Sequence, residues 1–158
     1  MKVVSIDPGL RNLALAVFVD GKLKDYGVYD LYDYSPTKKK RTDYSFLIHC
    51  FIKAEPKIFK NMDALCIENQ MKAKFKVIAH SFRCFFFDVA HKISPLSVRR
   101  SFKISKSDYK KNKVASKKYV EKHIFKNKKD KYYKHKKQDD IADAILIGLY
   151  YMKHYKNT

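Results

Sequence analysis

The sequence of 158 residues lacks cysteine pairs, long apolar runs and enough acidic residues to balance its basic ones. Its three cysteines, Cys50, Cys66 and Cys84, are odd in number and form no CxxC pair, so neither a disulfide framework nor a zinc knuckle is indicated. We expect them to be small buried side chains in an intracellular, reducing compartment. No window approaches the roughly 20 apolar residues of a membrane span, and the first apolar run is too short for the core of a signal peptide.

The scarcity of acidic residues is the strongest compositional signal. Thirty-five Lys and Arg stand against 16 Asp and Glu, which gives a formal net charge of +19 and a pI near 9.8. Residues 92–137 hold 18 basic and three acidic residues, whereas residues 138–158 are slightly acidic. Because so much like charge repels itself in a compact state, we expect an anionic partner. Nucleic acid is the first candidate and an anionic membrane surface is the second.

The length fits one domain, residues 1–158, and 46% hydrophobic residues are enough for a core. Hydrophobic patterning predicts strands at 3–6, 13–19, 23–29 and 64–67, with a hairpin turn at Asp20-Gly21. It predicts helices around 46–52, 75–89, 114–124 and 141–152, exposed loops at 31–43 and 126–137, and a further strand at 93–98. This order favours an α/β fold in which helices pack on a mixed sheet.

Four carboxylates stand at the ends of predicted elements. Asp7 ends the first strand, and Glu68, one of only three Glu in the chain, ends the strand at 64–67. Asp140 and Asp143 are three residues apart and share one face of the last helix. Clustered carboxylates raise one another's pKa, and a hard divalent cation such as Mg²⁺ relieves that repulsion. Two such cations about 4 Å apart hydrolyse phosphodiesters, so the pattern points to a nuclease with a basic substrate-binding surface.

Each carboxylate also has a structural interpretation. Asp7 before Pro8-Gly9 is typical of a turn. Asp139 or Asp140 would serve as a helix N-cap, and an acidic first turn suits the helix dipole. Glu68 is the hardest to explain in this way, because Glu is a poor strand residue directly after a buried run.

Three motifs carry a resemblance to a known family. Ser5-Ile6-Asp7-Pro8-Gly9 with Asn12 resembles the opening motif of RuvC-like Holliday junction resolvases, which belong to the ribonuclease H-like superfamily. Ile67-Glu68-Asn69-Gln70 resembles the second motif of the poxviral and yeast mitochondrial branches. Asp139-Asp140-Ile141-Ala142-Asp143-Ala144 is similar to the final acidic helix of the family. The motifs occur in the family's order across residues 3–152, and the poxviral and large DNA virus branch fits best by length and Lys-rich composition.

The resemblance implies a ribonuclease H-like fold, with a mixed five-stranded sheet flanked by helices. It implies a homodimer that makes Mg²⁺-dependent paired nicks in a four-way DNA junction, with no membrane partner. For a viral member it implies the host-cell cytoplasm or a viral replication site.

The family's site residues carry over by position. Asp7, Glu68, Asp140 and Asp143 are the implied ligands of two Mg²⁺ ions, which Mn²⁺ is expected to replace; Asp139 is the less suitable ligand. The family also has a functional lysine upstream of the last helix, for which Lys110, Lys111 and Lys113 are candidates. Lys113 is favoured because it directly precedes the predicted helix 114–124. Residues 71–76 vary among related sequences and say little about junction recognition.

Two other functions share some of these features. One is a nuclease of the same fold that acts on RNA or on RNA–DNA hybrids. The other is a nucleic-acid-binding module without catalysis, although such a module gains nothing from carboxylates near phosphates. The aromatic helix from Phe75 to Phe87 has more large apolar side chains than one helical stripe buries, which favours a dimer contact over burial within the monomer.

Overall fold

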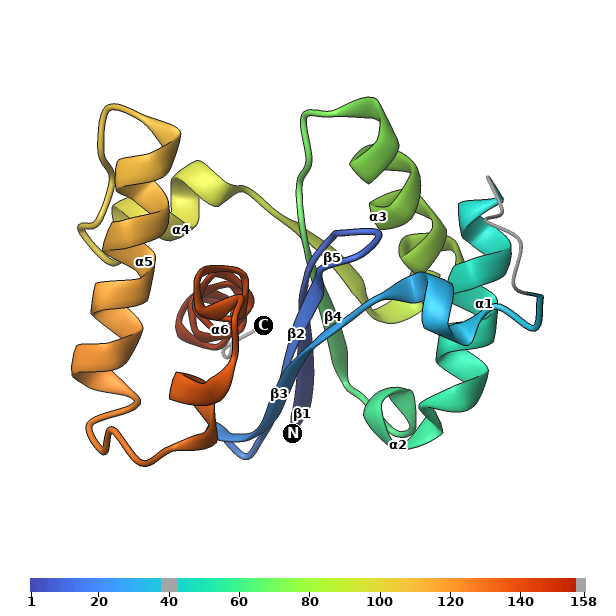
Figure 1. Ribbon diagram of the computed structural model, residues 1–158, viewed down its shortest axis with the longest axis horizontal. Coiled ribbons are helices and arrows are strands. Elements are labelled where there is room, and N and C mark those ends of the chain that lie inside the picture. The colour runs from blue at the N-terminus through green and yellow to red at the C-terminus, as the bar shows by residue number, and fades with distance from the viewer. Residues whose placement is uncertain (38–42, 156–158) are drawn as a thin grey trace.

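A computed structural model describes residues 1–37 and 43–155 of the chain (Figure 1). The strands are β1 Lys2–Asp7, β2 Leu13–Val19, β3 Lys22–Tyr29, β4 Ala64–Glu68 and β5 Ala90–Ile93. The α-helices are α1 Tyr44–Ala54, α2 Pro56–Phe59, α3 Ala73–Phe85, α4 Pro95–Ser101, α5 Tyr109–His123 and α6 Gln138–His154. Three short 3-10 helices are η1 Leu31–Tyr34, η2 Phe87–Val89 and η3 Lys131–Lys134.

The strands form one mixed sheet in the order β3-β2-β1-β4-β5. β1 pairs antiparallel with β2, which pairs antiparallel with β3 through the Asp20-Gly21 turn. β4 pairs parallel with β1, and β5 pairs parallel with β4. The parallel half of the sheet therefore brings the carboxyl ends of β1 and β4 to the same edge.

Helices cover both faces of the sheet (Figure 1): α4, α5 and α6 lie on one side, and α1, α2 and α3 lie on the other. Successive strand residues alternate between the two layers, as their pleat requires. Val3 packs in the core that faces α6, while Val4 and Ile6 pack in the core that faces α1 and α3. β1 is thus buried on both faces and forms the centre of the molecule.

The sheet face beneath α6 is made largely of small side chains, which lets the helix lie close to the strands. Ala14, Ala16 and Ala64 pack there. Gly148 marks the closest approach, because a Cβ at this position would lie 2.4 Å from Phe18 Cε2 and 2.8 Å from Ser5 Oγ. The Ser5 hydroxyl donates a hydrogen bond of 2.6 Å to the carbonyl of Ala144, which joins the middle of β1 directly to α6.

The structure bears out the predicted strands at 3–6, 13–19, 23–29 and 64–67 and the predicted helices at 46–52 and 141–152, which lie within α1 and α6. The predicted helix 75–89 is borne out as far as Phe85, where α3 ends, and the 3-10 helix η2 follows it. The predicted strand 93–98 is wrong: β5 ends at Ile93, and Pro95 begins α4. Proline suits the first helical position because its missing N–H is not needed there, and the Ser94 side chain caps the helix by accepting from the N–H of Ser97. The predicted helix 114–124 begins earlier, at Tyr109, where Asp108 accepts from the N–H of Lys111.

The two predicted loops contain more structure than expected. η1 lies within the predicted loop 31–43, and Leu31 is fully buried; residues 38–42 fall outside the described part of the chain. η3 lies within the predicted loop 126–137, and Tyr132 is fully buried there. Apolar side chains in Lys-rich segments therefore anchor these segments to the core.

The cysteines are only partly as expected. Cys66 is buried in β4, Cys50 is half-buried, and Cys84 is exposed on α3, where its Sγ lies 3.5 Å from His80 Nε2. All three are free thiols. Across residues 1–37 and 43–155, no helix has the length and apolar character that a bilayer crossing requires.

Candidate active site

Asp7 and Glu68 lie side by side at the carboxyl ends of the two central strands. The register of β1 and β4 pairs Ile6 with Ile67, so the residues that follow them come together. Asp7 is the last residue of β1 and only 9% exposed, which is not the environment of an ordinary turn residue. A tight turn follows it, and at Gly9 a Cβ would lie 2.3 Å from the carbonyl oxygen of Asn12.

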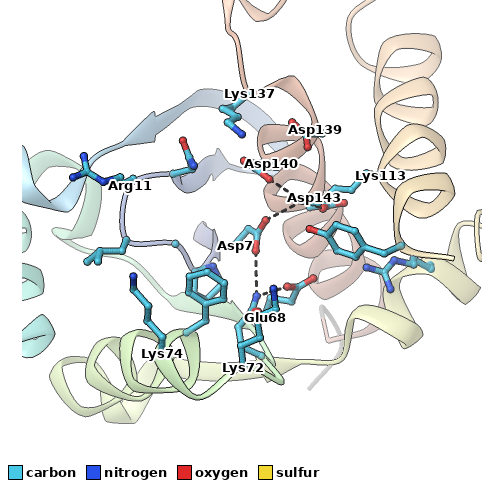
Figure 2. A pocket seen from close by; sticks show the side chains of 18 of the residues that line it. Asp7, Arg11, Glu68, Lys72, Lys74, Lys113, Lys137, Asp139, Asp140 and Asp143 are labelled. Carbon is cyan, nitrogen blue, oxygen red and sulfur yellow. Dashed lines mark hydrogen bonds and ion pairs between the residues drawn. The ribbon is translucent and has the colours of Figure 1, made fainter.

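α6 adds Asp140 and Asp143 from its first two turns (Figure 2). The hydrogen bond between Ser5 of β1 and Ala144 of α6 fixes the position of the helix relative to the strand. Because Asp143 directly precedes Ala144, the same contact holds Asp143 near the end of β1. Asp143 is 7% exposed. The N-cap of α6 is Lys137 and makes no side-chain capping bond, so neither Asp139 nor Asp140 serves as the N-cap.

Lys113 reaches this carboxylate cluster from α5. Its Nζ lies 2.5 Å from Asp143 Oδ2, 2.8 Å from Asp140 Oδ1 and 3.5 Å from Asp7 Oδ2. Of the three candidate lysines, Lys113 is the one the structure places in the cluster. Lys111 is exposed and pairs with Asp108 at 3.3 Å, and Lys110 is also exposed.

Gln70 bridges Asp7 and Glu68, the fourth carboxylate of the cluster. Its Nε2 donates to Asp7 Oδ1 at 3.2 Å and also to Glu68 Oε2. The side-chain amide thus contacts both carboxylates with its positive end, although it carries no net charge. Gln70 stands in the second sequence motif, but sequence reasoning assigned it no role.

Burial and mutual repulsion dominate the electrostatics of the cluster. Burial raises the pKa of Asp7 well above its usual range, and Glu68 raises it further, while Lys113 opposes both. Burial, followed by Asp143, raises the pKa of Glu68 to about 7. Burial alone would lower the pKa of Lys113, but Asp143, Asp7 and Asp140 together raise it. A single ammonium group therefore does not neutralise the cluster, and the site favours additional positive charge.

The cluster forms the floor of an open pocket of about 770 Å³. Figure 2 shows the basic side chains on its rim, which come from several elements. They are Arg11, Lys72, Lys74, Arg99 and Lys137. Tyr109 also lines the pocket and is 69% exposed, with Lys113 Nζ 5.9 Å from its ring centroid. An acidic floor with a basic rim is suited to a polyanion that meets cations at the floor.

The donor set fits divalent cations chemically, since four carboxylates are hard oxygen ligands. In the part of the chain that the structure describes, however, no three acidic, His or Cys side chains are grouped as the ligands of a ready-made metal site. The ammonium group of Lys113 stands between Asp7, Asp140 and Asp143 and supplies the positive charge beside them in this structure.

Sequence reasoning gave no role to several residues of the pocket, among them Gln70, Arg99, Tyr109 and the rim residues Arg11, Lys72 and Lys74. A role for Gln70 could have been predicted from the sequence, since Gln70 lies two residues after Glu68 in the second motif. Arg99 lies on α4, which was predicted as a strand, and Tyr109 lies before the predicted start of its helix. Their placement depends on how α4 and α5 pack beside α6.

Comparisons with known proteins agree with this architecture. The family profile described as "Poxvirus A22 protein" matches residues 1–155. A comparison with curated protein sequences gives no match. The fowlpox virus Holliday junction resolvase superposes with a TM-score of 0.71 at 22% identity, covering 97% of this chain and 98% of that one. The yeast mitochondrial Holliday junction resolvase gives 0.68 at 17% identity, covering 98% and 83%.

A bacterial protein shares the fold as well. Thermus thermophilus RuvC, solved in complex with a Holliday junction substrate, gives a TM-score of 0.62 at 18% identity, covering 98% of this chain and 96% of that one. The predicted fold class is confirmed: the chain has the ribonuclease H-like mixed sheet of five strands flanked by helices.

Proposed function

The chain belongs to the poxvirus A22 protein family, and from this we propose that it is a Mg²⁺-dependent endonuclease that resolves four-way DNA junctions. The predicted membership of the poxviral branch is thereby confirmed. Family membership further supports a viral protein that acts in the host-cell cytoplasm or at a viral replication site. One observation carries the proposed activity: Asp7, Glu68, Asp140 and Asp143 converge on the floor of a pocket whose rim is basic.

In this proposal the four carboxylates hold two Mg²⁺ ions. When bound, these ions supply an activated water molecule and stabilise the leaving oxygen of the phosphodiester. Gln70 orients the carboxylates of Asp7 and Glu68 through its two hydrogen bonds. The rim residues Arg11, Lys72 and Arg99 hold the DNA backbone over the carboxylates.

Lys113 has two roles in the same proposal. In the metal-free protein its ammonium group lies between three carboxylates and reduces their repulsion. When the carboxylates are engaged by cations, the flexible lysine stem allows the ammonium group to turn toward the phosphate in the pocket. The residue then helps to hold the negative charge of the substrate.

We also propose that the protein is a homodimer, since a four-way junction has two-fold symmetry and resolution needs two symmetric cuts. α3 buries Ile78 and Phe82 against the sheet, while Val77 and Phe85 on α3 and Phe87 on η2 are 47%, 44% and 68% exposed. The helix is therefore not fully buried within one chain. An exposed apolar face beside a buried one supports a contact with a second copy.

A cleavage panel tests the proposed function. Labelled four-way junctions, flaps, duplexes and RNA–DNA hybrids are incubated with the protein and Mg²⁺, with Mn²⁺ in parallel. We expect paired nicks at symmetric positions in the junction. Faster cleavage of the hybrid would instead establish the alternative ribonuclease activity, and binding without any cleavage would establish the binding module.

Variants of the four carboxylates serve as the internal control of that panel. We expect Asp7→Asn, Glu68→Gln, Asp140→Asn and Asp143→Asn each to lower cleavage by more than about 100-fold, because even groups that only orient metal ligands are worth 10- to 100-fold. Junction binding should persist, since affinity comes from the basic surface. A variant that cleaves at the wild-type rate removes that residue from the ligand set.

A further inference from the structure

A second hollow, of about 390 Å³, adjoins the carboxylate pocket. Glu68 and Gln70 line both spaces, so the loop between β4 and α3 is the partition between them. The N–H of Asn69 in this loop donates to the carbonyl of Ile93 at 2.8 Å, which holds the partition against β5. The hollow therefore has a defined wall.

Three basic side chains line this hollow. Lys76 and His80 are four residues apart on α3 and share one helical face, and Lys92 comes from β5. Lys92 pairs with Ile67, which packs in the core on the α3 side of the sheet, so the pleat directs Lys92 toward the same side. We call this space the Lys76–Lys92 hollow.

The charges in the Lys76–Lys92 hollow are not balanced from within the protein. Across the described residues, no ion pair involves Lys76 or Lys92. The one carboxylate in the lining, Glu68, already accepts a hydrogen bond from Gln70. Asn69 and Gln70 add amide groups, and Ala79 is the one apolar member of the lining. Lysine ammonium groups and side-chain amides are hydrogen-bond donors that suit an anion such as a backbone phosphate.

We propose that the Lys76–Lys92 hollow is a second phosphate subsite, which binds a backbone phosphate next to the one that is cut; this rests on the proposed function. A DNA strand is continuous, so when one phosphate lies over the carboxylates, its neighbour must lie close beside that pocket. The hollow is contiguous with the pocket through Gln70 and has the opposite charge to the carboxylate floor. Its contacts fix the register of the strand without reading sequence.

The test combines a lysine variant with neutral phosphates. The variant is Lys76→Gln/Lys92→Gln, and the matched control is Lys22→Gln/Lys24→Gln, which removes the same charge from β3 at the opposite edge of the sheet. Junctions carry a single uncharged methylphosphonate at successive positions around the cut. Binding is measured in the cleavage-deficient Asp143→Asn background, and cleavage is measured without that change.

We expect the Lys76→Gln/Lys92→Gln variant to bind the unmodified junction about 3- to 10-fold more weakly than the control variant, and to lower the slope of log affinity against log salt by about 1. Wild type and control should lose affinity when one particular phosphate beside the cut is neutral. The Lys76→Gln/Lys92→Gln variant should show no further loss at that same position.

Two results overturn the inference and are distinguishable. If the wild type binds and cuts the junction but the variant matches the control at every methylphosphonate, the hollow is not a phosphate subsite and the proposed function stands. If the wild type neither binds nor cuts the junction, both proposals fall together.

Discussion

At the scale of single residues, the site is shaped by how repulsion between buried carboxylates is reduced. Lys113 does so with a full charge placed within 3.5 Å of three aspartates. Gln70 does so with a neutral amide that donates to Asp7 and Glu68. Both side chains keep the acidic groups together in the absence of a cation, and this makes the metal-free protein sensitive to changes at either position.

We expect Lys113→Gln to destabilise the metal-free protein by about 3 kcal/mol near neutral pH, because removal of one partner leaves buried carboxylates uncompensated. Urea denaturation in the presence of a chelator measures this. Lys111→Gln is the control, since Lys111 is 69% exposed and should change stability by less than about 0.5 kcal/mol. Equal stability of the two variants would show that Lys113 does not compensate the cluster.

Glu68→Gln should stabilise the metal-free protein increasingly as the pH rises. Burial and then Asp143 raise the pKa of Glu68 from 4.5 to about 7, so the folded state holds a proton that the unfolded chain has lost. The wild type therefore loses stability as the pH rises through that window, whereas the Gln variant has no group to ionise there. The advantage of the variant should grow by about 3 kcal/mol between about pH 4 and pH 8, from a shift of this size. Thermal or urea unfolding of both proteins between about pH 4 and pH 8 measures this difference in stability.

The comparison of the two proteins at each pH removes the influence of titrating groups that do not interact with Glu68. Asp7 does interact with it, because Glu68 raises the pKa of Asp7, and therefore contributes to the difference. A stability difference that is independent of pH would mean that Glu68 ionises in the folded state as it does in the unfolded chain. Saturating Mg²⁺ should reverse the sign of the difference, because the ionised carboxylate is then the form that binds.

At the scale of secondary-structure elements, the site depends on the contact between β1 and α6. β1 provides Asp7 and α6 provides Asp140 and Asp143, and Ser5 joins the two elements through Ala144. The distance between these carboxylates therefore follows from how closely the helix lies on the sheet. That distance is set at Gly148, two turns along α6 from the acidic residues.

We expect Gly148→Ala to lower stability by about 1–3 kcal/mol, because the added Cβ overlaps Phe18 at 2.4 Å. Alanine favours a helix over glycine by about 1 kcal/mol, which offsets only part of this. Cleavage should fall as well, since the displaced helix carries Asp140 and Asp143. The double variant Gly148→Ala/Phe18→Leu should recover part of both losses, and additive losses would contradict the assigned contact.

At the scale of the whole molecule, the basic segment 126–137 and the exposed apolar side chains of α3 and η2 belong to different elements. The lysines between 126 and 137 are exposed, and the segment is anchored by the buried Tyr132 and by the hydrogen bond between Tyr26 and Asp130. Lys137, at its end, lines the carboxylate pocket. The apolar side chains Val77, Phe85 and Phe87 instead belong to α3 and η2. Under the proposed function, the basic segment contacts DNA and the exposed apolar side chains contact a second copy.

The anchored basic segment should contribute to the salt dependence of junction binding. We expect replacement of Lys126, Lys128, Lys129 and Lys136 by Gln to lower the slope of log affinity against log salt by about 1 for each phosphate that these lysines neutralise. The same number of changes at Lys22, Lys24, Lys53 and Lys57 is the control. Titrations between about 50 and 200 mM salt measure the slope. An unchanged slope would identify the segment as a solvated loop that does not touch DNA.

The apolar face of α3 should determine the oligomeric state. Light scattering is expected to give twice the chain mass of 18.7 kDa, with and without junction DNA. Phe85→Glu/Phe87→Glu should yield a monomer, because each change would place a charge in the interface, whereas Leu96→Glu on α4 should leave the dimer intact. A wild-type protein that remains a monomer on the junction and still makes paired cuts would exclude this arrangement.

The sequence by itself determined the central strands, the acidic helix and the fold family. The strands at 3–6 and 64–67 are buried on both faces. Such strands can be predicted from sequence because nearly every side chain in them is apolar. A carboxylate directly after each run, and a pair three residues apart on a helix, could be identified in the same way. Local patterns of this kind need no knowledge of distant contacts.

Only the tertiary structure decided how the charges are arranged. The sequence favoured Lys113 over Lys110 and Lys111 only through its position directly before the predicted helix 114–124. The packing of α5 beside α6 is what places Lys113 rather than Lys111 among the aspartates. α4 could not be recognised, since seven residues with a proline at the first position carry little periodicity. The Lys76–Lys92 hollow joins α3 to β5 across separate segments of the chain. Such juxtapositions depend on side-chain packing between distant elements, which no local pattern records.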